Sequence, residues 1–120
     1  MLNLNSIILF SESSEELVKF YKNVFEKEPE WSEGGYTGFQ VGVSHFIIGP
    51  HSEVHGKNTH PQRLLLNFEA NDVEGEFSRI KKLGATVIAK PYHPGEAKDM
   101  LLATFADPDG NYFQLASPMK

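Results

Sequence analysis

One order of elements occurs twice along this chain: a short apolar strand, an amphipathic helix, and then further strands. An offset that aligns Ser13 with Asp72 pairs two residue types that commonly cap helices. The same offset pairs the apolar positions of the two helices, Val18, Tyr21 and Val24 with Phe77, Ile80 and Leu83. A pattern repeated at a fixed offset is typical of a duplicated structural unit. The sequence therefore predicts an α+β fold of two βαβββ modules, with an ordinary α+β sandwich and coincidental spacing as the alternative.

The first predicted module covers about residues 1–50. It begins with an apolar strand over residues 6–10, and the polar run SESSEE ends this strand. A helix opened by Ser13 or Ser14 follows, with an apolar stripe at helical spacing made of Leu17, Val18, Tyr21, Val24 and Phe25. Strands over residues 37–41 and 44–48 complete the module. The polar stretch 51–61 has no periodicity and is predicted to be a linker.

The second predicted module covers about residues 62–120. Its strand over residues 63–69 precedes a helix opened by Asn71 or Asp72, with Phe77, Ile80 and Leu83 on the buried stripe and Gly84 at the end. Strands are expected over residues 86–89, 101–105 and 111–116.

The run DPDGN, residues 107–111, is predicted to be the turn of the last hairpin. Pro108 presets one backbone angle, and Gly110 and Asn111 tolerate a positive φ. A calcium loop has oxygen ligands at similar spacing, but its twelfth position requires a bidentate Glu and here that position is Pro118. The turn is therefore the better interpretation.

Composition restricts the class of partner. The net charge is -5 and no basic run is longer than Lys81-Lys82, which argues against a nucleic-acid surface. No apolar run approaches the roughly 20 residues of a membrane span, and the start of the chain lacks a basic leader, so a cytoplasmic protein without membrane contact is expected. The chain has no cysteine, which excludes disulfides and thiolate metal sites. A small molecule or a protein is the expected partner.

Side chains alternate along a strand, so each strand has one face that a helix can cover and one mixed face. Ile7, Leu9, Phe46, Phe113 and Leu115 belong to the apolar faces. The mixed faces carry Ser6, Ile8, His45, Ile47, Leu65, Asn67, Tyr112 and Gln114. A few polar groups among apolar side chains are typical of small-molecule sites, so these eight residues are the predicted ligand-binding set.

Three motifs resemble the vicinal oxygen chelate superfamily: KFYKNVF at residues 19–25, KKLGATV at 81–87 and FADPDGNYFQL at 105–115. That superfamily includes glyoxalases, bleomycin-resistance proteins and extradiol dioxygenases. The resemblance covers almost the whole chain. It implies a single domain over residues 1–120, two βαβββ modules that form a curved, cup-shaped mixed sheet, and commonly a homodimer.

The resemblance also implies where a divalent metal would be held in metal-using members, and it places those positions at Ser6, Ile47, Leu65 and Gln114. This chain departs from the pattern, because Ile47 and Leu65 have no donor atom and Ser6 and Gln114 are neutral. A divalent cation requires several oxygen or imidazole ligands. The expected function is therefore sequestration of a small organic molecule without metal or other cofactor, with Gln114 bonded to the ligand or to a neighbour.

The alternative function is an enzyme of the same superfamily, a glyoxalase-like lyase or isomerase with an atypical site. His45 would be its acid or base, and Glu69 is a candidate for orienting the imidazole.

Two further groups have two interpretations each. Trp31 and Tyr36 beside Gly34-Gly35 are either walls of a pocket or ordinary packing residues, and the loop residues 92–95 either contact a ligand or only shape a crossover. The linker residues His51, His55 and His60 are interpreted as solvated loop side chains rather than metal ligands.

Overall fold

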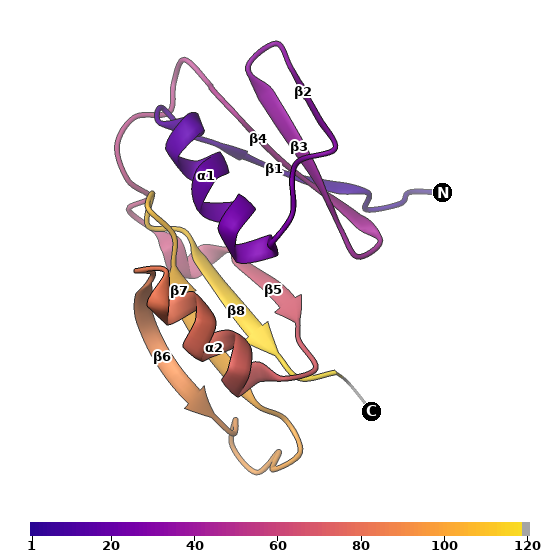
Figure 1. The fold of residues 1–120 in the computed structure, drawn as a ribbon, viewed down its shortest axis with the longest axis vertical. Coiled ribbons are helices and arrows are strands. Elements are labelled where there is room, and N and C mark those ends of the chain that lie inside the picture. Colours follow the sequence, from indigo (N-terminus) through magenta and orange to yellow (C-terminus); the bar gives the residue numbers. More distant parts are fainter. Residues whose placement is uncertain (119–120) are drawn as a thin grey trace. The chain divides into compact units, whose positions relative to one another are not determined.

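A computed structural model describes residues 1–118 of the chain. The chain divides into two compact units, Met1–Gly56 and Lys57–Lys120. Each unit has one α-helix and one four-stranded sheet, with strand orders β1-β4-β3-β2 and β5-β8-β7-β6 (Figure 1). The two orders are equivalent, so the prediction of an α+β fold built from two βαβββ modules is confirmed.

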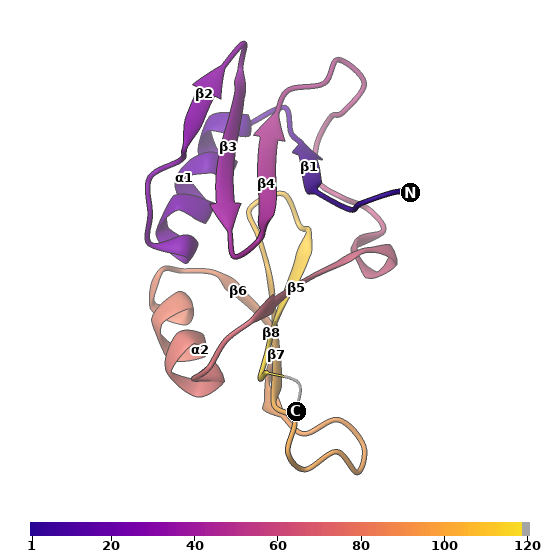
Figure 2. The same ribbon diagram turned by 90° about the vertical axis from the view of Figure 1, so that its right-hand side faces the viewer.

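The first unit follows the expected order of elements. Strand β1 pairs with β4 in parallel, and β3 is antiparallel to both β4 and β2. Figure 2 shows α1 on one face of this sheet, with β2 at the edge. The elements are β1 Ser6–Phe10, α1 Ser14–Phe25, β2 Trp31–Glu33, β3 Tyr36–Val41 and β4 Ser44–Gly49.

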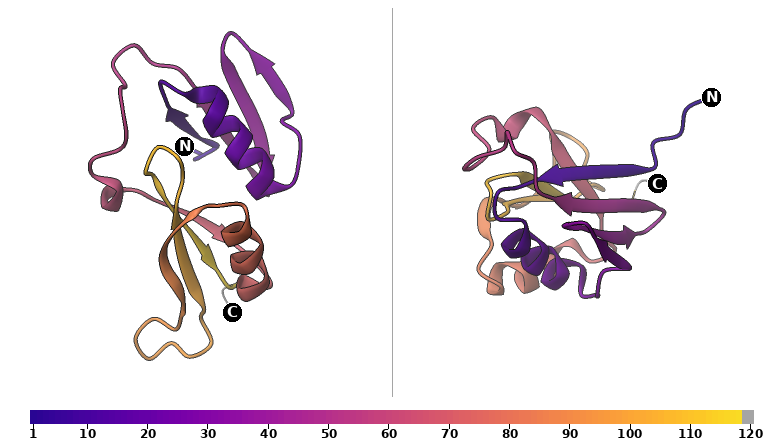
Figure 3. Two further views of the ribbon diagram at one scale, coloured as in Figure 1. Left: turned by 60° about the vertical axis from the view of Figure 1, so that its left-hand side comes forward. Right: turned by 90° about the horizontal axis from the view of Figure 1, so that it is seen from above.

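The second unit repeats this arrangement with a short 3-10 helix, η1, before its first strand. Strand β5 is parallel to β8, and β7 is antiparallel to β8 and β6. In Figure 3, α2 lies along one face of this sheet. The elements are η1 Pro61–Arg63, β5 Leu65–Glu69, α2 Val73–Lys82, β6 Thr86–Tyr92, β7 Leu102–Ala106 and β8 Tyr112–Ala116.

Aromatic side chains form much of the core in both units. In the first unit the Tyr21 ring of α1 lies 4.8 Å from that of Phe46, measured between centroids. In the second, the Phe105 ring stacks on Phe77 at 5.1 Å and on Phe113 at 5.5 Å. Burying rings of this size supplies a large share of the hydrophobic stabilisation of small units.

Helix boundaries agree with the capping patterns of the sequence. Asp72 caps α2, since its carboxylate accepts a hydrogen bond from the Gly75 amide at 3.0 Å. Ser13 caps α1 without a side-chain bond to the helix, and its amide donates to the hydroxyl of Ser11 instead. Gly84 follows the end of α2 with a φ of +94°.

Leu83 was expected on the buried stripe of α2, and this expectation is wrong. It is 44 % exposed and lies just beyond Lys82, the last residue of α2. Val73, at the start of α2, is buried and joins the stripe instead.

The ends of β3, β4, β7 and β8 differ from expectation by one residue, and three differences are larger. Strand β2 was not predicted, because three residues are too few to show alternation. Strand β6 continues three residues beyond Ala89 and includes Pro91, which an edge strand tolerates. Residues 63 and 64 were predicted to be strand, but η1 ends at Arg63 and β5 begins at Leu65.

The DPDGN turn is confirmed. The Gly110 amide donates to the Asp107 carbonyl at 2.9 Å, and Gly110 has a φ of +83°. The buried Asp107 carboxylate accepts hydrogen bonds from the Asp109 amide at 2.9 Å and the Asn111 amide at 3.0 Å. Asn111 keeps a negative φ, and its side-chain amide also donates to Asp107.

Candidate functional site

Each sheet has one face covered by its own helix and one face without a helix. We call the second kind the helix-free face. Cross-strand register shows which side chains share it, because directly paired residues point to the same side of a sheet. The first helix-free face carries Ser6, Ile8 and Phe10 on β1, His45 and Ile47 on β4, Tyr36, Gly38 and Gln40 on β3, and Trp31 and Glu33 on β2.

The middle row of the first helix-free face is apolar. Ile8 pairs with Ile47, Ile47 pairs with Gly38, and Gly38 pairs with Trp31. Ile8 is 47 % exposed and Trp31 is 41 % exposed. A row of part-exposed apolar side chains in the middle of a small sheet is a surface that an apolar ligand group can cover.

Two glycines allow aromatic rings to lie against this sheet. A Cβ atom on Gly38 would come within 2.3 Å of the indole of Trp31, and one on Gly49 within 2.0 Å of the ring of Tyr36. The Tyr36 hydroxyl donates to the Pro50 carbonyl at 3.2 Å. The rings of Trp31 and Tyr36 therefore lie on the first helix-free face and do not belong to the core that α1 covers.

A polar row runs through the middle of the second helix-free face. Asn67 of β5 pairs with Gln114 of β8, which pairs with Thr104 of β7. The Gln114 side-chain amide donates to the Asn67 side-chain carbonyl at 2.9 Å. Gln114 is expected to bond either to a ligand or to a neighbouring side chain, and in the structure it bonds to Asn67.

The rows on either side of this polar row are largely apolar. One contains Leu65, Tyr112 and Ala106, and the other contains Ala116 and Leu102 with Glu69 and Tyr92 at its ends. Leu65 and Tyr92 are both 43 % exposed. Polar atoms flanked by apolar walls fit the usual composition of a small-molecule site.

All eight residues of the predicted ligand-binding set lie on the helix-free faces. They form four directly paired couples across parallel strands: Ser6 with His45, Ile8 with Ile47, Leu65 with Tyr112, and Asn67 with Gln114. Ser6–His45 and Leu65–Tyr112 occupy equivalent positions in the two units, and so do Ile8–Ile47 and Asn67–Gln114.

Phe10, Gly38 and Gly49 also lie on this surface, although the predicted ligand-binding set does not include them. Phe10 is 37 % exposed, and its ring lies 6.5 Å from Tyr36 and 5.0 Å from His51, measured between centroids. For Gly38 the available signal was a glycine inside the predicted strand 37–41, because such a glycine marks a close approach of another group.

His45 was the candidate acid or base. Its backbone amide donates to the Asn5 carbonyl at 3.1 Å, and within residues 1–118 no hydrogen bond joins its imidazole to a carboxylate. Glu69, the candidate orienting residue, lies in the other unit.

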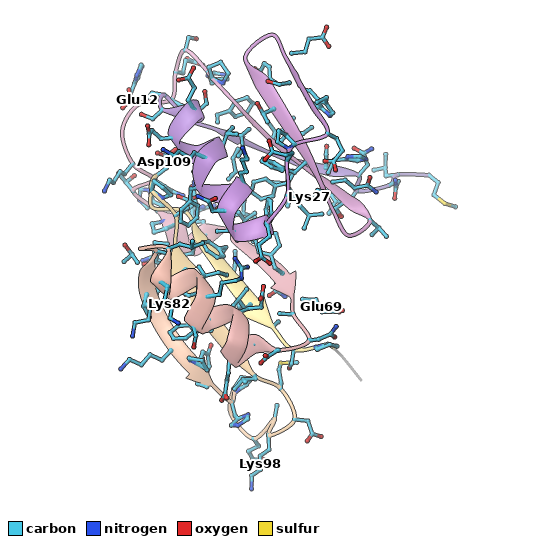
Figure 4. All side chains as sticks on the ribbon, in the orientation of Figure 1. Glu12, Lys27, Glu69, Lys82, Lys98 and Asp109 are labelled. Atoms are coloured by element: carbon cyan, nitrogen blue, oxygen red, sulfur yellow. The ribbon has the colours of Figure 1, made fainter. Side chains whose placement is uncertain are left out.

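The linker histidines each have a local neighbour. The His51 Nδ1 accepts from the Glu53 amide at 3.1 Å, and the His55 Nδ1 lies 3.6 Å from a carboxylate oxygen of Glu12, labelled in Figure 4. The His60 Nδ1 is 3.1 Å from the Thr59 hydroxyl. Across the described part of the chain, no three His, Asp or Glu side chains form a group that could hold a metal ion.

Residues 93–95, for which ligand contact is one of two interpretations, lie in the loop between β6 and β7. The His93 Nδ1 lies 2.8 Å from the Met100 carbonyl oxygen, so this bond closes the base of the loop. Lys98 projects from its tip (Figure 4). None of the helices described in residues 1–118 is long and apolar enough to cross a membrane.

A comparison with models of protein families finds a match for this chain. The family model described as a glyoxalase-like domain matches residues 6–116. No curated protein matches the sequence.

Solved structures with low sequence identity share the fold. A glyoxalase/bleomycin resistance protein/dioxygenase family enzyme from Burkholderia phytofirmans has a TM-score of 0.79 at 22% identity, over 98% of this chain and 100% of its own. A lactoylglutathione lyase from Agrobacterium tumefaciens has a TM-score of 0.73 at 16% identity, over 96% and 92% of the two chains. A fosfomycin resistance protein from Listeria monocytogenes has a TM-score of 0.69 at 20% identity, over 99% and 93%.

Proposed function

Since this chain belongs to the glyoxalase-like domain family, within the vicinal oxygen chelate superfamily, we propose that it binds a small organic molecule on its helix-free faces without a divalent metal. One observation carries the proposal: on these faces, part-exposed apolar side chains adjoin a few polar ones at neighbouring register positions. Apolar walls with a small number of placed polar groups are what small-molecule sites require.

The first helix-free face can cover the apolar part of a ligand. Ile8, Ile47 and the Trp31 ring offer a continuous row of apolar surface. Covering such surface is favourable by roughly 25 cal/mol per Å², so a ligand that covers about 100 Å² of it gains about 2.5 kcal/mol before the cost of association. Ser6 and His45, in the adjacent row, would supply polar contacts.

A divalent cation does not fit the positions that hold metal in metal-using members. Ile47 and Leu65 supply only alkyl groups, and Ser6 supplies a neutral hydroxyl. Gln114 donates its amide hydrogen to Asn67 and carries no negative charge. Four such side chains do not repay the dehydration of a divalent ion, so no step of binding is assigned to a metal.

The alternative, a lyase or isomerase that uses His45, lacks a supporting contact in the structure. A catalytic base is ordinarily held in place by a third group, and within residues 1–118 no carboxylate bonds to the His45 ring. We therefore assign no reaction.

A homodimer is also part of the proposal, and it is supported by the family resemblance. Light scattering coupled to size-exclusion chromatography tests it directly. Twice the mass of one chain supports the dimer, and the mass of one chain at micromolar concentration contradicts it.

The binding function is tested by titrating ¹⁵N-labelled protein with a panel of neutral, anionic and cationic small molecules, with EDTA present throughout. At least one compound is expected to shift the amide resonances of β1, β4, β5 or β8 and the single Trp31 indole resonance. If every shift lies on α1 or α2, or if removing EDTA and adding Zn²⁺ is required for binding, the proposal fails.

A matched pair of variants locates the binding surface. Ile47→Glu places a charge in the apolar row and is expected to weaken binding of the compound found in the panel by at least tenfold. Val43→Glu makes the same kind of change at the tip of the β3–β4 turn, where the side chain is 96 % exposed, and is expected to leave binding unchanged. Equal effects of the two changes would contradict the assignment of the face.

A further inference from the structure

The two amides of Asn67 and Gln114 form a pair on the second helix-free face, on the edge strand β5 and its neighbour β8. They lie at directly paired positions of the adjacent parallel strands β5 and β8, and one hydrogen bond of 2.9 Å joins them. Side chains on strands are held more rigidly than side chains on loops. The pair therefore presents its remaining polar atoms in a defined arrangement.

Counting donors and acceptors shows what remains. A primary amide has one carbonyl oxygen and two N–H groups. In the bond between the two residues, the donating amide uses one N–H and keeps its carbonyl oxygen and its second N–H, and the accepting amide keeps both N–H groups. If the oxygen and nitrogen of both side-chain amides are exchanged, Asn67 becomes the donor and Gln114 the acceptor, and the same kinds of atoms remain unbonded. Within residues 1–118, no other hydrogen bond to either side chain is found.

The remaining atoms are thus one free carbonyl oxygen and N–H groups on both neighbouring strands, and the pair has no charge. A carboxylate can use only the N–H groups, and an ammonium group or a metal ion can use only the carbonyl oxygen. A carboxylate is further disfavoured by Glu69, which lies two residues along β5 on the same face and is labelled in Figure 4. A neutral group with a neighbouring N–H and C=O can use both kinds of atom.

We propose that the Asn67–Gln114 pair selects ligands with a neutral cis-amide group, such as a lactam or an imide. The N–H of the ligand would donate to the free carbonyl of the pair, and its C=O would accept from the free NH₂. Leu65 and Tyr112, the next couple along the same strands, would cover the adjoining ring. This inference rests on the proposed binding function and adds the chemical class of the ligand.

The test uses small ring compounds of nearly equal shape. The whole ¹⁵N-labelled chain is titrated with 2-piperidone, which has both groups, with N-methyl-2-piperidone, which has only the acceptor, and with cyclohexanecarboxylate. The side-chain resonances of the two amides are assigned from their loss in Asn67→Leu and Gln114→Leu. We expect 2-piperidone to shift both side-chain resonances and to bind about tenfold more tightly than the other two probes.

Variants show whether the pair causes the preference. Asn67→Leu and Gln114→Leu are each expected to reduce the tenfold preference to about one. Gln62→Leu, the same kind of change at an exposed position of η1, is expected to keep it. The dispersion of the ¹⁵N spectrum reports whether each variant is folded.

The outcomes separate this inference from the binding function. If all three probes shift the β5 and β8 resonances with equal affinity, or if the preference survives both variants, the faces bind small molecules but the amide pair does not select them. If 2-piperidone causes no shift at the pair while another compound of the panel binds elsewhere on the faces, the inference is overturned and the binding function stands.

Discussion

Replacing Gly38 with Ala tests the packing of the single tryptophan on the first helix-free face. A Cβ atom at this position would lie 2.3 Å from Trp31 Cε2 and 2.4 Å from Trp31 Nε1, far inside van der Waals contact. Because Trp31 is on the edge strand β2 and is 41 % exposed, its ring can swing outward while the sheet stays intact. The variant is therefore expected to fold with a displaced indole.

The size of the effect follows from the area that the ring covers. A tryptophan buries at most about 250 Å², so with 41 % of Trp31 exposed, roughly 150 Å² is covered. At about 25 cal/mol per Å² this corresponds to roughly 4 kcal/mol as an upper limit. A displaced ring keeps part of its contacts, so we expect Gly38→Ala to lower the free energy of unfolding by about 2 kcal/mol.

Two measurements check this expectation. Urea denaturation followed by far-ultraviolet circular dichroism gives the free energy of unfolding. The emission of Trp31, the only tryptophan, is expected to move to longer wavelength as the indole becomes hydrated.

A double-mutant cycle identifies the cause. With Trp31→Ala already present, the steric conflict is absent, and Gly38→Ala should raise stability by about 0.5 kcal/mol because alanine is preferred to glycine inside a strand. A loss of about 2 kcal/mol in that background as well, or an unchanged emission maximum in Gly38→Ala, would refute the reasoning.

Three further changes have expected outcomes that follow from local geometry. Asp107→Ala removes the acceptor of two backbone amides in the last hairpin, and it is expected to lower the free energy of unfolding by about 2–3 kcal/mol in urea denaturation; a loss below about 0.5 kcal/mol would contradict this. Glu26→Gly relieves a left-handed backbone with φ 55° at the end of α1, and it is expected to raise the same quantity by about 1 kcal/mol, so that any decrease would count against it. The hydrogen bond from Lys27 is the main cause that lowers the pKa of Glu30, followed by the bond from the Gln40 amide, so Lys27→Met is expected to raise the pKa of Glu30 toward its ordinary value. A lowered carboxyl pKa contributes stability above the pKa of the unfolded chain, and this contribution is lost as the pH falls through the folded pKa. In Lys27→Met the loss should therefore occur at higher pH. NMR titration of the Glu30 carboxyl carbon measures the midpoint, and an unchanged midpoint would contradict the assigned cause.

The arrangement of the strands could be predicted because each helix-covered face is strongly apolar. Phe46 and Phe113 identify the face that a helix must cover, and alternation then places His45 and Gln114 on the opposite side. The predicted ligand-binding set lies on the helix-free faces for this reason.

Contacts between distant strands could not be predicted in the same way. The bond between Asn67 and Gln114 depends on the register of two parallel strands that are 47 residues apart, and a pattern of alternation does not fix that register. The contact of Trp31 with Gly38 depends on β2, whose three residues show no period. Leu83 was misplaced because its spacing of three residues from Ile80 matches a buried stripe, whereas the buried part of α2 ends with Ile80.

The most direct test of the account is the stoichiometry of metal binding at the positions that hold metal in metal-using relatives. Purified protein is dialysed to equilibrium against Zn²⁺, Ni²⁺ or Mn²⁺ and the bound metal is measured by mass spectrometry. The same measurement is made on Gln114→Leu and on a variant with His51, His55 and His60 changed to Ala. We expect Gln114→Leu to retain as much metal as the unmodified chain, and any metal bound to be lost with the three linker histidines. One tightly held equivalent that disappears in Gln114→Leu and persists without those histidines would contradict metal-free binding.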